Sequence, residues 1–195
     1  MSFTRGTQVE CLYAFAGAAT QLATFTTEDN LQKTYPVCPL PGALFTNTGQ
    51  DSSTFRVKAG GQMGFTTGAP TFLWSIRLMT GTAWSAGGVL LGATAAVATG
   101  ASAVVTTPWF LDADITLRTL SIGATSTVVT MGEVRAPAAL ATPFSATIPS
   151  LAVAPTATTV DNTAAYNLFL SCACGTSNSL NLINLQYLKV YGETR

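Results

Sequence analysis

Histidine is absent from this 195-residue chain, and charged residues make up only 9% of it. An ordinary soluble protein is roughly a quarter charged. The missing imidazole excludes every mechanism that needs a histidine base, ligand or pH switch, including serine triads and most zinc enzymes. Nine Lys and Arg balance nine Asp and Glu, so the chain also lacks the basic surface that follows nucleic-acid phosphates.

Sequence signatures of catalysis are also missing. Gly60-Gly61 and Gly87-Gly88 lack the lysine of a phosphate loop, and no Gly-x-Ser-x-Gly elbow occurs. Asp112 and Asp114 are spaced to suit an acid–base pair or a cation site. We interpret them instead as the solvent face of a strand, partnered by Arg118 and by a neighbouring Arg or Lys. We therefore expect no enzyme, no cofactor and no small-molecule substrate.

The four cysteines do not form a metal-binding pattern. Cys172 and Cys174 form a Cys-Ala-Cys motif, while Cys11 and Cys38 are distant in sequence. Structural zinc sites use two close cysteine pairs, or cysteine with histidine. In a strand Cys172 and Cys174 project to the same face, which predicts small core residues. A disulfide to Cys38 or to another subunit stays open.

A membrane span and a secretory leader are both disfavoured. No residue between Arg77 and Asp112 is charged, but the segment 87–105 is mostly Ala, Gly, Thr and Ser, which transfer weakly into lipid. At the start of the chain, Gln8 and Glu10 interrupt the apolar stretch that a leader needs. We expect strands and loops, and no membrane partner.

Apolar residues alternate with polar ones over most of the chain, at a period of two. The predicted strands lie at 54–59, 72–78, 109–118, 127–134, 166–174 and 180–191, the last with a bulge near Ile183. Clusters of Gly, Asn, Ser and Pro separate these runs. The segments 93–105 and 136–163 read as long surface connections. The pattern predicts an all-β body over residues 43–195, a two-sheet sandwich of jelly-roll type with seven to nine strands.

Residues 1–42 differ from this body and form a predicted N-terminal arm with a connector. The Ala-rich segment 9–23 fits one short helix or an extended arm. Three prolines within 34–42 make that stretch a stiff connector. An arm this apolar either packs on the body or reaches onto a neighbouring molecule.

The tryptophans and the low charge bear on association. Trp74 and Trp109 lie at apolar positions of their strands and are predicted core residues, whereas Trp84 lies in a loop, as a surface contact or as an anchor folded onto the body. With 48% hydrophobic residues and net charge +0 the chain should fold, and its surface lacks self-repulsion. It is either a secreted or exposed stable domain or a subunit whose faces are mostly covered by partners.

Several segments resemble small jelly-roll structural proteins of tailed-bacteriophage virions. They are the opening Met-Ser-Phe-Thr-Arg-Gly-Thr-Gln-Val-Glu, the connector Tyr-Pro-Val-Cys-Pro-Leu-Pro-Gly-Ala-Leu-Phe, the strand at 55–61 and the closing Leu-Lys-Val-Tyr-Gly. The resemblance implies a capsid decoration (cement) protein, often a homotrimer, bound outside the shell to the major capsid protein. It implies a virion location after synthesis in the host cytoplasm, and it supplies no catalytic residues.

From the arm and the exposed loop we select candidate partner-binding residues: Phe3, Arg5, Tyr13, Phe15, Phe25 and Trp84. The alternative function is a tail-associated or surface carbohydrate-binding (receptor-binding) module, in which exposed aromatic rings would stack on sugars.

Overall fold

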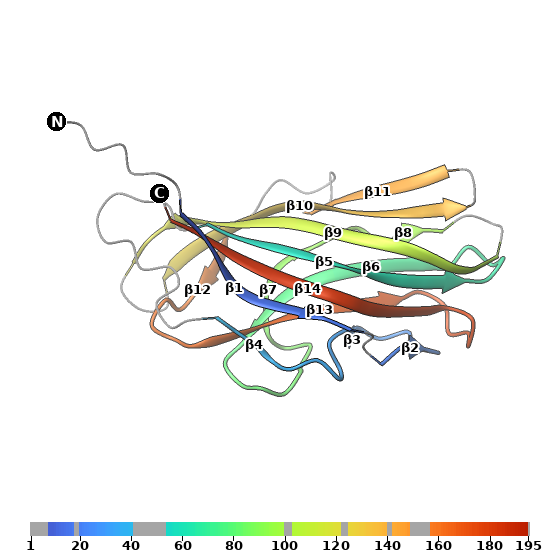
Figure 1. Cartoon of the computed structure of the whole chain (residues 1–195), viewed down its shortest axis with the longest axis horizontal. Coiled ribbons are helices and arrows are strands. Elements are labelled where there is room, and N and C mark those ends of the chain that lie inside the picture. Colours follow the sequence, from blue (N-terminus) through green and yellow to red (C-terminus); the bar gives the residue numbers. More distant parts are fainter. Residues whose placement is uncertain are drawn as a thin grey trace.

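Alternation of apolar and polar residues produces two antiparallel sheets that pack face to face as a jelly-roll-like sandwich, and the predicted all-β class is confirmed (Figure 1). A computed structural model describes residues 8–17, 20–40, 54–99, 103–121, 125–139, 142–148 and 157–194. Within these ranges there is no helix. The long strands run along the longest axis of the molecule.

Each sheet has a main path of hydrogen-bonded strands and two short side strands. The described large sheet has eight strands. Its main path is, in order, β1 (Gln8–Ala16), β14 (Leu182–Thr194), β5 (Thr54–Phe65), β9 (Val104–Thr119), β10 (Ser126–Ala139) and β11 (Thr142–Ile148). The side strands are β2 (Leu22–Ala23), which pairs with β14, and β12 (Thr158–Val160), which pairs with β10. The described small sheet has six strands. Its main path is, in order, β3 (Asp29–Asn30), β13 (Tyr166–Cys174), β6 (Thr71–Met79) and β7 (Val89–Ala93). The side strands are β4 (Cys38–Leu40), which pairs with β13, and β8 (Val97–Ala98), which pairs with β6.

The core lies between the sheets and is filled from both inner faces. Trp74 of β6 and Trp109 of β9 are fully buried and meet across the interior with ring centroids 6.2 Å apart. Phe72 lies 5.9 Å from Trp74 on the same strand. Both tryptophans are therefore core residues, as predicted.

A bulge in β14 lets apolar side chains face the core on both sides of it. The register of β14 on β5 shifts between Leu185 and Tyr187, two residues beyond the predicted bulge at Ile183. The Trp109 indole nitrogen donates to the carbonyl of Asn184 at 3.0 Å. The bulge is thus held by a hydrogen bond from the core.

The described part of the predicted arm lies within the sandwich. The segment 8–16 is an extended edge strand, β1, paired antiparallel with β14 near the other end of the chain, and not a helix. Residues 38–40 of the proline-rich connector form β4 on β13. Residues 8–40 therefore supply strands to both sheets. They form one structural unit with the sandwich, and the predicted boundary at 42/43 does not set them apart from it.

Both predicted surface connections contain strands, which corrects the sequence interpretation. The segment 93–105 includes β8, paired with β6, and the start of β9. The segment 136–163 includes the end of β10, then β11 and β12, both paired with β10. Ala and Thr dominate these segments and give little contrast between inward and outward positions, so the alternation is hidden.

Candidate functional site

The predicted contact residues of the arm are largely used inside the molecule. The Tyr13 hydroxyl donates to the carbonyl of Pro36 at 2.8 Å. The Phe15 ring packs on Tyr35 with centroids 4.2 Å apart. These contacts fix β1 to the segment that leads to β4. Phe3 and Arg5 lie outside the described residues.

Phe25 and Trp84 also turn toward the body. Phe25 is buried and lies 6.5 Å from the Phe72 ring. The Trp84 ring lies 6.0 Å from Phe169, a buried residue of β13. Trp84 is therefore positioned as an anchor of the loop between β6 and β7, the second of the two roles considered for it.

The buried cysteines are core residues without disulfides. Cys38, Cys172 and Cys174 are buried, and all three are free thiols, as is the exposed Cys11. Burial raises the pKa of Cys38 to about 12 and the pKa of Cys172 well above its ordinary value. In the described part of the chain, no group of His, Cys, Asp or Glu could hold a metal ion.

The outer face of the small sheet is covered by the chain itself. Arg77 of β6 donates through Nε and Nη2 to the two carboxylate oxygens of Glu28, at 2.7 and 2.8 Å. The Ser171 hydroxyl donates to the same carboxylate. Arg77 also donates to the carbonyl of Gly88 at 2.9 Å. Arg77 thus fastens both the segment before β3 and the β6–β7 loop over this sheet.

The outer face of the large sheet is open in its centre. We call it the large-sheet face; it comprises Arg56 and Lys58 of β5, Phe110, Asp112 and Asp114 of β9, Met131, Glu133 and Arg135 of β10, and Tyr187, Lys189 and Tyr191 of β14. Four of the chain's nine Lys and Arg residues and three of its nine Asp and Glu residues lie here. Seven of the chain's 18 charged residues therefore lie on one surface.

Ion pairs cross the middle of the large-sheet face. Arg56 donates to both oxygens of Asp112, at 2.7 and 2.6 Å, and Lys58 lies 3.7 Å from the same carboxylate. Burial alone would raise the pKa of Asp112, but the hydrogen bonds and charges of Arg56 and Lys58 outweigh it and hold the pKa below its usual value. Asp114 lies 3.7 Å from Arg56. The aspartates thus lie on a solvent face and pair with Arg56 and Lys58 of the neighbouring strand, as predicted. Arg118, the other predicted partner, lies on the same strand, four residues beyond Asp114. The ion pairs disfavour an acid–base role.

Apolar and aromatic groups surround these charges. Phe110 is 50% exposed and Met131 is 60% exposed. The Tyr187 ring lies across Gly60, where an added Cβ would come within 2.7 Å of it. Large exposed apolar side chains beside paired charges are typical of protein-contact surfaces.

Sequence reasoning missed this face, although it contained a signal. Phe110 and Met131 occupy outward positions beside the charged residues of their strands. A large apolar residue at a solvent-facing position is the exception that indicates a contact.

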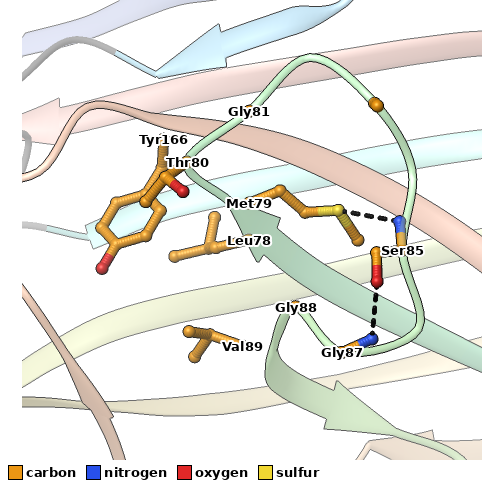
Figure 2. Close-up of a pocket in the computed structure, with 10 residues that line it drawn as sticks. Leu78, Met79, Thr80, Gly81, Ser85, Gly87, Gly88, Val89 and Tyr166 are labelled. Atoms are coloured by element: carbon orange, nitrogen blue, oxygen red, sulfur yellow. Dashed lines mark hydrogen bonds between the residues drawn. The ribbon is translucent and has the colours of Figure 1, made fainter.

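A pocket of about 360 Å³ opens where β6 ends and β7 begins (Figure 2). Its walls combine aliphatic side chains with glycines, hydroxyls and one aromatic ring, from Leu78, Met79, Thr80, Gly81, Ala83, Ser85, Gly87, Gly88, Val89 and Tyr166. The Ser85 amide donates to the Met79 sulfur at 3.1 Å, and the Gly87 amide donates to the Ser85 hydroxyl at 3.1 Å. These bonds shape the rim of the pocket.

Comparison with known proteins gives no relative: no family model, curated protein or solved structure matches the chain. Among the described residues, no helix is long and apolar enough to cross a membrane.

Proposed function

We propose that this chain is a non-enzymatic structural protein of a virion, a capsid decoration (cement) protein that binds outside the shell to the major capsid protein and to copies of itself. The observation that supports it is the large-sheet face. One outer face of the sandwich is covered by the chain itself, while the other exposes Phe110 and Met131 among paired charges. The resemblance of the sequence to phage structural proteins supplies the class of partner.

The physical mechanism is avidity on a symmetric surface. Each contact that a small neutral sandwich makes is weak, but repetition over a shell and linkage between copies raise the effective concentration of every further contact. Such a layer would resist capsid expansion by bridging capsomers. Nucleic acid, membrane and small-molecule substrates have no part in this mechanism, and the protein would act on the capsid surface after synthesis in the host cytoplasm.

The experiment tests both the location of the protein and the face that it uses. We expect mass spectrometry and electron cryo-microscopy of purified particles to find the chain at regular positions on the shell. Added to particles that lack it, the wild-type protein should co-sediment, and Met131→Lys should weaken co-sedimentation at least about tenfold. Leu180→Lys is a matched control because Leu180 is 62% exposed in the turn before β14, away from this face. Absence of the chain from the particles would overturn the proposal.

The pocket at the β6–β7 loop supports a second candidate, a carbohydrate-binding module of a tail or another surface. Its volume of about 360 Å³ and its mixed lining, with the Tyr166 ring and the hydroxyls of Thr80 and Ser85, are compatible with a sugar. Trp84 does not line it. Binding on a glycan array that Ser85→Trp abolishes would favour this function over the first.

A further inference from the structure

The large-sheet face carries an ordered row of charges, beside which Arg135 of β10 forms an ion pair with Glu133 on its own strand. In one row across the sheet, Lys189 of β14 is paired in register with Lys58 of β5, Lys58 with Asp112 of β9, and Asp112 with Glu133 of β10. The row therefore reads positive, positive, negative, negative. In the adjoining row Arg56 and Asp114 repeat this order across β5 and β9.

A surface with this order is complementary to itself under one kind of two-fold rotation. One such axis runs parallel to the strands, between β5 and β9, in the plane of contact. Rotation about it brings the positive end of the charged row in one copy over the negative end of the row in the other. An axis across the strands would bring lysine over lysine. We propose that two copies of this chain bind face to face through the large-sheet face, related by the axis parallel to the strands.

This inference rests on the proposed function and assigns the large-sheet face to the contact between copies of the chain, so that Met131→Lys would weaken co-sedimentation by breaking the link between copies; the dimer itself can be tested without a capsid. The contact is isologous, so it closes at two copies and cannot by itself form a trimer. In a virion it would join two neighbouring molecules of the protein.

The apolar groups of the face obey the same symmetry. The register places Gly60 opposite Phe110 on the adjacent strands β5 and β9. The two-fold axis then brings Phe110 of one copy over Gly60 of the other, where the Tyr187 ring lies across the glycine. It also brings Arg135 over Tyr187 of the second copy, an arrangement suited to a cation–π contact.

Met131 and Tyr191 complete the match in the adjoining row. Tyr191 is paired in register with Arg56, and Asp114 with Met131. Tyr191 and Met131 therefore lie at the two ends of a row that crosses four strands. The rotation brings the Met131 thioether of one copy over the Tyr191 ring of the other, a favourable sulfur–aromatic contact. Met131, 60% exposed in one copy, would thereby be covered.

The area shared by the four strands suits a small interface. The register joins β14, β5, β9 and β10 along residues 54–60 of β5, and four strands about 4.8 Å apart over that length, at about 3.4 Å per residue, present roughly 460 Å² in plan. A standard protein interface buries about 800 Å² on each partner, so we expect a weaker dimer than a standard one.

Charge reversal tests the pairing because Lys189 and Glu133 lie three strand spacings apart, about 14 Å, within one copy. They meet only between copies. We expect Lys189→Glu and Glu133→Lys each to weaken dimerisation about tenfold or more in sedimentation velocity, since each homodimer contains two repulsive pairs. Glu133→Lys also loses the ion pair with Arg135 inside each copy, so the recovery on mixing is the decisive result. An equimolar mixture of the two variants should dimerise like the wild type, because every pair is then attractive. Leu180→Lys should have no effect, and thermal unfolding checks that each variant folds.

The outcomes separate this inference from the proposed function. A wild-type monomer at all concentrations, a trimer, or variants that do not recover on mixing would overturn the two-fold contact. A chain that dimerises in this pattern but is absent from particles would overturn only the virion proposal. A particle component that stays monomeric in isolation would overturn only the dimer.

Discussion

Glu28 and Arg77 show how a charge-poor chain places an ion pair in a shielded position. Their side chains are 17% and 14% exposed, and the carboxylate accepts bonds from Arg77 and Ser171. Burial by itself would raise the pKa of Glu28, but the bonds from Arg77 and Ser171 and the charge of Arg77 outweigh it and leave the pKa below normal. The pair joins the N-terminal segment to β6, so its loss should lower the stability of the small sheet.

We predict that Glu28→Gln lowers the free energy of unfolding at pH 7 by about 2 kcal/mol, less than for a fully buried pair because both groups retain some contact with water. Urea denaturation followed by tryptophan fluorescence measures it. Asp29→Asn is the control: Asp29 forms a more exposed pair with Lys33 and should cost less than about 0.5 kcal/mol.

The same variant should change the pH dependence. Because the folded-state pKa of Glu28 lies below its unfolded value, this contribution is present above about pH 4.5 and is lost as the pH falls through the folded pKa. The difference in stability between wild type and Glu28→Gln should therefore shrink from pH 7 to pH 3. A constant difference over that range would contradict the assigned role of the carboxylate.

At the scale of the elements, the backbones of β5 and β14 approach each other so closely at Gly61 that no side chain fits between them. A Cβ on Gly61 would lie 2.0 Å from the carbonyl oxygen of Asn184, at the bulge held by Trp109. The main chain there cannot move without breaking the indole hydrogen bond. The bulge therefore requires glycine at position 61.

We predict that Gly61→Ala lowers the free energy of unfolding by about 3 kcal/mol, since the methyl group forces the two strands apart. Gly81→Ala is the matched control, because no atom lies within 4 Å of the position that its methyl group would take, and it should change stability by less than about 0.5 kcal/mol. Chemical denaturation of both variants decides; equal stabilities would show that β14 shifts its register at little cost.

The sequence predicted strands where apolar and polar residues contrast sharply. Residues 111–118 alternate without a break, and β13 (Tyr166–Cys174) has the predicted bounds. β11 and β12 were not predicted, because alanine, threonine and proline do not distinguish the buried face of a strand from the exposed one. The extended form of β1 could not be distinguished from a helix, because it depends on pairing with β14, some 170 residues away. The candidate site depended on exposure, which alternation does not give: Phe25 proved buried, while Phe110 and Met131 proved exposed.

At the scale of the whole molecule, the two ends of the described chain lie side by side. β1 pairs with β14 along the edge of the large sheet, as Figure 1 shows, and Leu22, Phe25 and Leu31 enter the core from the segment between β1 and β4. The N-terminal segment is thus a structural part of the sandwich. This affects any experiment that removes the arm to test capsid binding.

We predict that deletion of residues 2–32 prevents cooperative folding. The deletion removes three buried apolar side chains and Glu28, and it leaves β14 as an unpaired edge open to aggregation. Loss of near-ultraviolet circular dichroism and of a sharp thermal transition would show it. Tyr13→Phe, which removes only the hydrogen bond to Pro36, should cost about 1 kcal/mol and retain the transition. A truncated chain that unfolds cooperatively at the wild-type temperature would show that the arm is separable. If the truncated chain cannot fold, its failure to bind capsids reports unfolding, and surface variants such as Met131→Lys become the valid test of the large-sheet face.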